Sequence, residues 1–212
     1  FLAKDLLYLL RSFSGYYSSA EKAEEVTRKV EVQQLEISEE DKKQLLDHML
    51  QNNEIAQTYG RLVFVSAFNL LEGTLNGLMR DHEMRIPSAD PSKINLWRAL
   101  TLVDKTKGIA ALIRGESDLD FDKDRAFNYL FRVSRNIRNA MIHPDFEEDL
   151  RGENTDPAEF YALNLDNILM TTASTVSIIR SLWKQIHGKP KPQWIEELDQ
   201  QIQVLIAAQM VD

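Results

Sequence analysis

Apolar residues recur at helical spacing along most of the chain, and no segment shows the sustained alternation that is typical of strands. The first part of the pattern predicts a helix over residues 1–10 and a further helix over residues 20–32. Between them, serine and glycine at 12–15 predict a loop. Ser38 precedes three acidic residues and predicts the N-cap of a helix that ends near residue 51.

The remaining apolar stripes predict longer helices, separated by proline and glycine. One is expected to follow the acidic caps at 118–122 and to end before Pro144, because a residue that precedes proline is disfavoured in the α conformation. A late helix is expected to begin at the Asp156-Pro157 pair. The other predicted helices are 55–80, 93–113 and 194–210, and the late helix is expected to end near 186.

These elements predict an all-α fold, an antiparallel helical bundle with additional N-terminal helices and a C-terminal helix. We divide the chain into an N-terminal helical extension (1–54), a helical bundle (55–187), and a linker with a C-terminal helix (188–212). The 212 residues, of which 43% are hydrophobic, are sufficient for a substantial core.

Composition limits the classes of function. The chain has no cysteine, which excludes disulfides and thiolate metal sites and favours a cytoplasmic protein. We see neither a signal peptide nor an apolar run that approaches the roughly 20 residues of a membrane span, so no membrane association is expected. A net charge of −8 argues against a sequence-independent nucleic-acid coat, because such binding depends on cations that displace counterions from phosphates.

Basic residues are nevertheless concentrated in one segment. Residues 125–144 contain no acidic residue, and the following segment, 145–156, is strongly acidic. At 100° per residue, one stripe of the predicted helix would be polar and would suit a polyanion. This stripe comprises Arg125, Tyr129, Arg132, Asn136, Asn139 and His143. Arg135 adds a further cation to the same helix and is also expected to contact an anionic substrate.

The opposite arc of this helix is apolar and is expected to face the core. It comprises Phe127, Leu130, Val133, Ile137 and Met141. Arg138 falls within this arc, where a guanidinium must meet a carboxylate or reach a water-filled cleft. Glu72 lies in an apolar stripe of the 55–80 helix, so we hypothesise that Glu72 and Arg138 form a pair. The alternative places Glu72 at the edge of its helix, in contact with water.

The end of the same helix carries the candidate chemistry. A lone histidine at a helix end most often interacts with free carbonyls or with the helix dipole. Here Asn139 precedes His143 by one helical turn and could orient its imidazole. The segment Arg138-Asn139-x3-His143 resembles the hallmark motif of the HEPN domain family, and the resemblance covers about residues 55–186 as a helical bundle.

The resemblance implies a metal-independent endoribonuclease, commonly a toxin or an anti-phage defence effector, whose site combines two motifs across a homodimer. Arg138 would stabilise charge on the phosphorane, His143 would transfer protons, and Asn139 would orient His143 or the phosphate. No metal or cofactor is required. The partners implied are RNA, a second copy of the chain, and an antitoxin or defence-system protein.

Two features leave the function open. Family members that are silenced by nucleotidyltransferase partners tend to carry a tyrosine two residues after the histidine, and this chain has Asp145 there. The family also includes members that bind without cleaving. The alternative is therefore a catalytically silent helical interaction module that dimerises or binds a larger effector.

Overall fold

The computed structural model describes residues 2–32, 38–83, 99–114, 123–142, 165–184 and 192–209. Almost all of these residues are helical and none of them forms a strand, so the predicted all-α class is confirmed. The elements are α1 (Leu2–Val32), α2 (Glu39–Glu83), α4 (Leu102–Arg114), α5 (Arg125–Asn128), the π-helical segment η1 (Tyr129–Ser134), α6 (Arg135–Ile142), α9 (Leu165–Lys184) and α10 (Gln193–Gln209).

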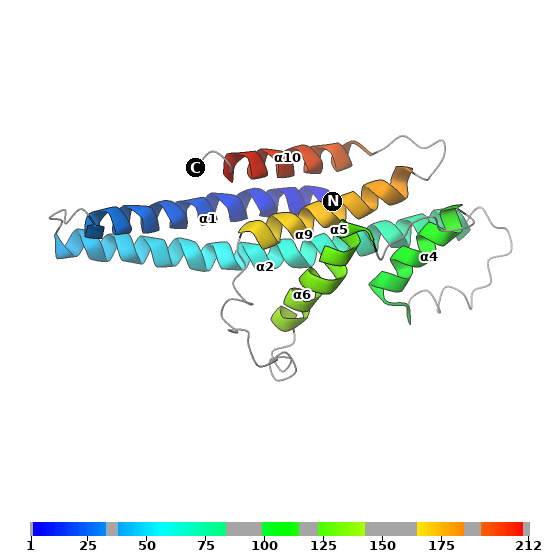
Figure 1. Ribbon diagram of the computed structural model, residues 1–212, viewed down its shortest axis with the longest axis horizontal. Coiled ribbons are helices and arrows are strands. Elements are labelled where there is room, and N and C mark those ends of the chain that lie inside the picture. The colour runs from blue at the N-terminus through cyan, green and yellow to red at the C-terminus, as the bar shows by residue number, and fades with distance from the viewer. Residues whose placement is uncertain are drawn as a thin grey trace.

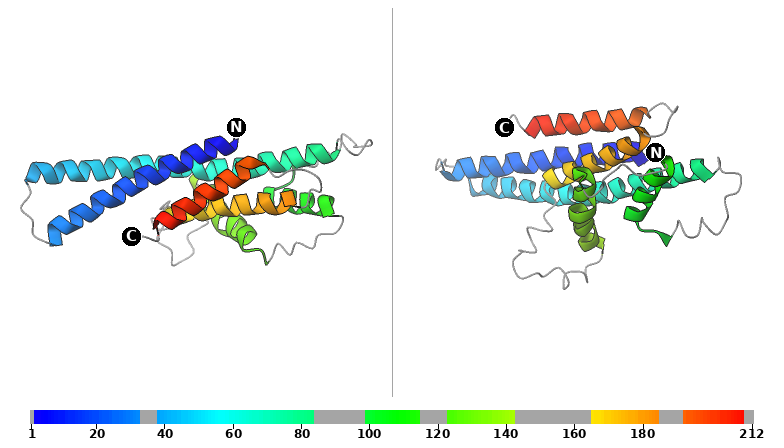
Figure 2. Two further views of the ribbon diagram at one scale, coloured as in Figure 1. Left: turned by 90° about the horizontal axis from the view of Figure 1, so that it is seen from above. Right: turned by 45° about the vertical axis from the view of Figure 1, so that its right-hand side comes forward.

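The two longest helices, α1 and α2, form an antiparallel pair along which the other helices are arranged (Figure 1). α9 packs on α2, and α10 packs on α9 and α1. α4 and α6 lie on the other side of α2 from α10 (Figure 1). Seen from above, α1 and α2 diverge toward the C-terminal end of α1 (Figure 2). Most side chains are exposed at that end, and the core lies where α9 covers α2.

The loop predicted at residues 12–15 is wrong, because α1 continues through it without interruption. Phe13 is fully buried in the middle of that segment and belongs to the same apolar face as Leu6 and Leu10. Packing of this face against α2 therefore outweighs the low helix propensity of the serines and of Gly15.

The predicted break between residues 51 and 55 is also absent, because α2 is a single helix of 45 residues. Asn52 lies in this region and is buried, with 8% of its surface exposed. Its side-chain amide donates to the backbone carbonyl of His48 at 3.0 Å and lies 2.9 Å from Nε2 of the same residue. These bonds satisfy the asparagine within the helix, so it does not end the helix.

A single apolar core joins the three predicted parts of the chain. Leu10 of α1, Leu71 of α2, Ile179 of α9 and Leu198 of α10 are all buried in one cluster. α2 also crosses the boundary predicted at residues 54 and 55. The extension, the bundle and the C-terminal helix therefore share one apolar core over the described residues.

The late helix and the helix predicted at 194–210 are confirmed where the structure describes them, whereas the predicted helix 93–113 is interrupted at residues 100 and 101, because Thr101 caps the start of α4. α4, α9 and α10 lie within or within one residue of the predicted ranges, and α10 begins at Gln193. The motif-bearing helix has Asp124 as its N-cap, with the carboxylate accepting from the Phe127 amide at 2.8 Å. The caps predicted at 118–122, Pro144, the Asp156-Pro157 pair and the 188–191 part of the linker lie outside the described residues.

α2 is long and apolar enough, by length and composition, to be compatible with a membrane span, which the sequence analysis did not anticipate. In this structure 44% of its most apolar stretch is buried against other helices. The central helix of a folded bundle has the same composition, because it is covered on more than one side. The finding is therefore weak support for a membrane protein.

Candidate nucleotide-binding site

The helix that carries the motif is not uniform. α5 and α6 are α-helical, and η1 between them is a π-helical segment in which the Arg135 amide donates to the Leu130 carbonyl, five residues earlier. A π turn accommodates one additional residue relative to an α turn. η1 therefore interrupts the α-helical hydrogen bonding ahead of α6.

The structure corrects one of the predicted faces. Val133 was expected in the core and is 43% exposed, whereas Phe131 and Ser134 are buried. At about 100° per residue from Arg125, Val133 lies at the edge of the apolar arc, and Phe131 and Ser134 lie on its buried side, so a regular helical wheel accounts for this burial. The hydroxyl groups of Ser134 and Thr171 of α9 lie 2.8 Å apart, where η1 packs on that helix.

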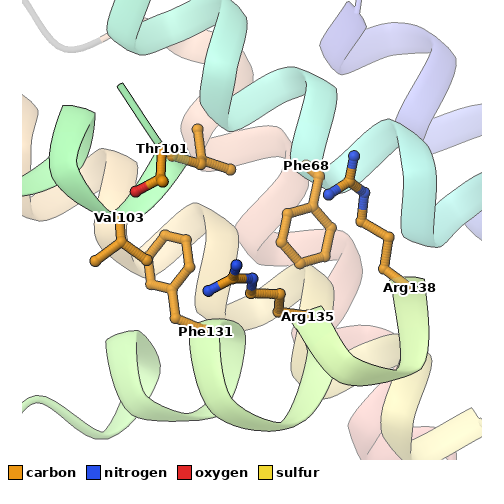
Figure 3. Close-up of a pocket in the computed structure, with 7 residues that line it drawn as sticks. Phe68, Thr101, Val103, Phe131, Arg135 and Arg138 are labelled. Carbon is orange, nitrogen blue, oxygen red and sulfur yellow. The ribbon is translucent and has the colours of Figure 1, made fainter. Parts of the chain in front are cut away.

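Two arginines lie at a cavity between η1, α6, α4 and α2. Arg135 and Arg138 line it together with two aromatic side chains, Phe68 and Phe131, and with residues 101–103 at the start of α4 (Figure 3). The cavity has a volume of about 210 Å³ and is partly open to solvent. Its floor is apolar and its cations belong to the predicted motif and its neighbouring turn.

Arg138 is half-buried, and its guanidinium carbon lies 5.3 Å from the centre of the Phe68 ring. A guanidinium in this position is stabilised by the negative face of the ring. The predicted ion pair between Arg138 and Glu72 is wrong. The Glu72 carboxylate instead accepts from the ammonium of Lys105 at 2.6 Å, across the interface between α2 and α4.

This pairing is explained by the burial of the two cations. The Lys105 side chain is only 7% exposed and therefore requires a carboxylate, while Arg138 reaches the cavity and its solvent. Of the two ways in which Arg138 could be accommodated, the structure shows the solvent-accessible cleft. Glu72 itself is 47% exposed, in agreement with the alternative that it meets water.

The cavity is positively charged. Within the described part of the chain, no acidic residue lines it and neither Arg135 nor Arg138 forms an ion pair. Asp104 is close in sequence to the cavity wall but caps α4 through the hydroxyl of Thr101. Two unneutralised guanidinium groups beside a partly open cavity on a chain of net charge −8 attract an anion locally.

The other predicted substrate-binding residues do not line this cavity. Arg125, Arg132 and Asn136 are exposed on the surface of the same helix. Tyr129 is turned toward α9, where its hydroxyl donates to the Asn167 side chain at 2.9 Å. Burial, with a smaller contribution from the Asp166 carboxylate, raises the pKa of Tyr129. Tyr129 therefore joins η1 to α9, and its predicted role in substrate binding stays a prediction.

The remaining motif residues are only partly described. Asn139 lies in the last two turns of α6, but its side chain is outside the described part of the structure, as is His143 altogether. Their predicted catalytic roles consequently stay predictions. Among the described residues, no group of three metal-ligating side chains is placed to hold a metal ion.

Sequence reasoning missed the aromatic and α4 contributions to the cavity. Phe68 lies in the apolar stripe of the predicted 55–80 helix, and the sequence pattern gave no role at a site to Phe68 or Phe131. The 125–144 segment contains several arginines and no acidic residue, and two of these arginines line the cavity. No protein-family model matches the chain, and no curated protein or solved structure matches it.

Proposed function

We propose that this protein is a metal-independent endoribonuclease of the HEPN type that acts as a homodimer. The observation that supports the proposal best is the cavity lined by Arg135 and Arg138, with no acidic side chain among its described lining residues, on the helix that carries the Arg-Asn-x3-His motif. Planar guanidinium groups bind phosphate oxygens in bidentate fashion. A phosphodiester is therefore the ligand that best fits this charge and its position.

The motif supplies the groups that metal-free RNA cleavage requires. Attack of the 2′-hydroxyl on the adjacent phosphorus needs a base for the hydroxyl proton and an acid for the departing 5′-oxygen. His143 would fill these roles, and a second His143 from the partner copy would allow both at once. Arg138 would stabilise the charge that develops on the phosphorane, and Asn139 would orient His143 or the phosphate.

A homodimer would use exposed apolar side chains at its interface. Val133 of η1 and Met170 of α9 are 43% and 45% exposed. They are equally compatible with the second candidate function, a catalytically silent helical module that dimerises or binds a larger effector.

Incubation of the purified protein with total RNA in EDTA tests the proposal. We expect cleavage that leaves 2′,3′-cyclic phosphate and 5′-hydroxyl ends, detected by labelling the new 5′ ends with polynucleotide kinase. Arg138→Ala and His143→Ala should each lower the cleavage rate by roughly 100-fold or more, because each removes a group that acts on the transition state. Growth arrest on expression in cells would fit a toxin or defence effector.

The matched control is Arg61→Ala on α2, an exposed arginine that does not line the cavity. It removes the same charge and should leave the rate within about twofold of the original, because an isolated surface charge contributes little. Circular dichroism of each variant confirms the fold. Absence of cleavage, or cleavage that persists in both Arg138→Ala and His143→Ala, would reject the enzyme and favour the interaction module.

A further inference from the structure

The cavity is suited to a flat aromatic ligand. Its volume of about 210 Å³ exceeds the roughly 150 Å³ of an engineered apolar cavity that accommodates benzene. Apolar side chains form part of its wall, since Phe68, Leu102, Val103 and Phe131 line it together with Thr101 and the two arginines. Unpaired nucleobases are commonly bound in such places, by contact with aromatic and aliphatic side chains.

The polar side chains at the cavity offer hydrogen-bond donors. A guanidinium carries five N–H groups and no acceptor, and the guanidinium groups of Arg135 and Arg138 line the cavity. The hydroxyl of Thr101 is already engaged, because it donates to the Asp104 carboxylate at 2.6 Å and accepts from the Asp104 amide at 3.2 Å. A ligand that enters the cavity therefore binds most tightly if the edge that faces the guanidinium groups carries hydrogen-bond acceptors.

The two arginines occupy different parts of the cavity (Figure 3). Arg138 lies against the Phe68 ring, at the position of the motif that would contact the scissile phosphate. The guanidinium of Arg135 points toward Phe131 and Val103, over the apolar floor (Figure 3). Arg135 is therefore the cation that a base lying on this floor would meet first.

We propose that this cavity is a base-binding subsite of the ribonuclease, in which Arg135 selects an unpaired guanine or uracil over adenine or cytosine. Guanine presents the O6 and N7 acceptors and uracil presents carbonyl oxygens, whereas adenine and cytosine present amino groups that would face the guanidinium N–H groups. The inference rests on the proposed function in one respect, which is that the substrate is RNA.

Binding of uncleavable RNA tests the subsite separately from catalysis. Short 2′-O-methyl oligonucleotides of uridine and cytidine, and of inosine and adenosine, form two matched pairs that differ in a carbonyl and an amino group. Fluorescence anisotropy should give Kd values about tenfold lower for the carbonyl member of each pair. That ratio corresponds to about 1.4 kcal/mol, within the range of a bidentate arginine contact to a base.

Two variants probe the geometry. Arg135→Gln replaces the guanidinium by an amide that can both donate and accept, and Val103→Phe fills the cavity without changing the charge. Each should reduce the ratio of Kd values to about one. The control Arg61→Gln removes an exposed charge elsewhere on α2 and should retain the tenfold preference while weakening both members of a pair alike.

Equal Kd values for both members of each pair in the original protein would overturn the subsite, as would a preference that survives in Arg135→Gln. Arg135 is exposed, so its replacement is not expected to disturb folding even if Val103→Phe does. Cleavage in EDTA without base preference in binding would contradict the proposed subsite and support the proposed ribonuclease activity. Base preference in binding without cleavage would support the subsite and contradict the ribonuclease activity.

Discussion

Charged side chains close to the cavity are distributed according to how much water each can reach. Lys105 is almost fully enclosed between α2 and α4 and has the Glu72 carboxylate at 2.6 Å. Arg138 keeps one side on the Phe68 ring and the other in the cavity. A compact ammonium loses more hydration on burial than a delocalised guanidinium, so the lysine has the greater need for a counter-ion.

Glu72→Gln should therefore lower the free energy of unfolding by about 1–2 kcal/mol, because it removes the carboxylate from a buried ammonium. Chemical denaturation at neutral pH measures the change. Further replacement of Lys105 by methionine should recover part of the loss, since no charge then remains buried.

The comparison variant is Glu39→Gln, which disrupts the exposed pair of Glu39 and Lys42. We expect a change of at most about 0.5 kcal/mol there. Equal losses for Glu72→Gln and Glu39→Gln would contradict the interpretation that burial of Lys105 makes the first pair important.

At the scale of elements, the helices are longer than the sequence pattern predicts, and one of them contains an irregularity that the pattern does not reveal. Serine and glycine in α1, and asparagine in α2, are compatible with helix because these helices pack against each other. The π turn of η1 lies where Ser134 contacts Thr171 of α9. Local propensity is worth at most about 1 kcal/mol per residue, and a packed face outweighs it.

Gly15→Ala tests the continuity of α1. A Cβ atom at Gly15 meets nothing within 4 Å, and the residue is helical, so the alanine should raise the free energy of unfolding by about 0.5–1 kcal/mol. Thermal denaturation followed by circular dichroism gives the change.

The matched substitution is Gly73→Ala in α2, where the new Cβ would lie 3.0 Å from Cδ1 of Leu2. The free energy of unfolding should rise less than for Gly15→Ala, because the Leu2 side chain must move to make room. A lack of stabilisation by Gly15→Ala would argue for the loop that the sequence predicted at 12–15.

At the scale of the whole molecule, one core extends from α1 to α10. Ile195, Leu198 and Ile202 of α10 are buried to within about one per cent of full burial, and Asp199 pairs with Arg180 of α9. The side chain of Arg11 donates to Gln201, which also joins α1 to α10. The C-terminal helix is therefore part of the bundle, and the site between α2, α4 and α6 shares its stability.

Leu198→Ala should lower the free energy of unfolding of the whole molecule by about 2–5 kcal/mol, because it leaves a cavity in the shared core. Far-ultraviolet dichroism and tryptophan fluorescence should report one coincident transition in denaturant.

Val204→Ala on the same helix provides the reference, since Val204 is 60% exposed and its truncation should change stability by at most about 0.5 kcal/mol. Two separate transitions, of which only one responds to Leu198→Ala, would instead support the division of the chain at residues 187 and 188.

The sequence by itself determined the all-α class, the approximate positions of most helices and the concentration of arginines in the 125–138 segment. These properties are local, because they depend on the spacing of apolar residues and on the count of charges. It also placed Arg138 correctly at a site where the guanidinium needs either a partner or water.

Only the tertiary structure decided which partner each charge has and which residues meet at the cavity. Glu72 pairs with Lys105, and Arg135 lines the same cavity as Arg138. Phe68 and Phe131 also line this cavity, although they are 63 residues apart in the sequence. The reason is that these partners come from different helices, and the packing of one helix on another decides which side chains meet. The sequence pattern gives the buried face of a helix, but not the helix that covers this face.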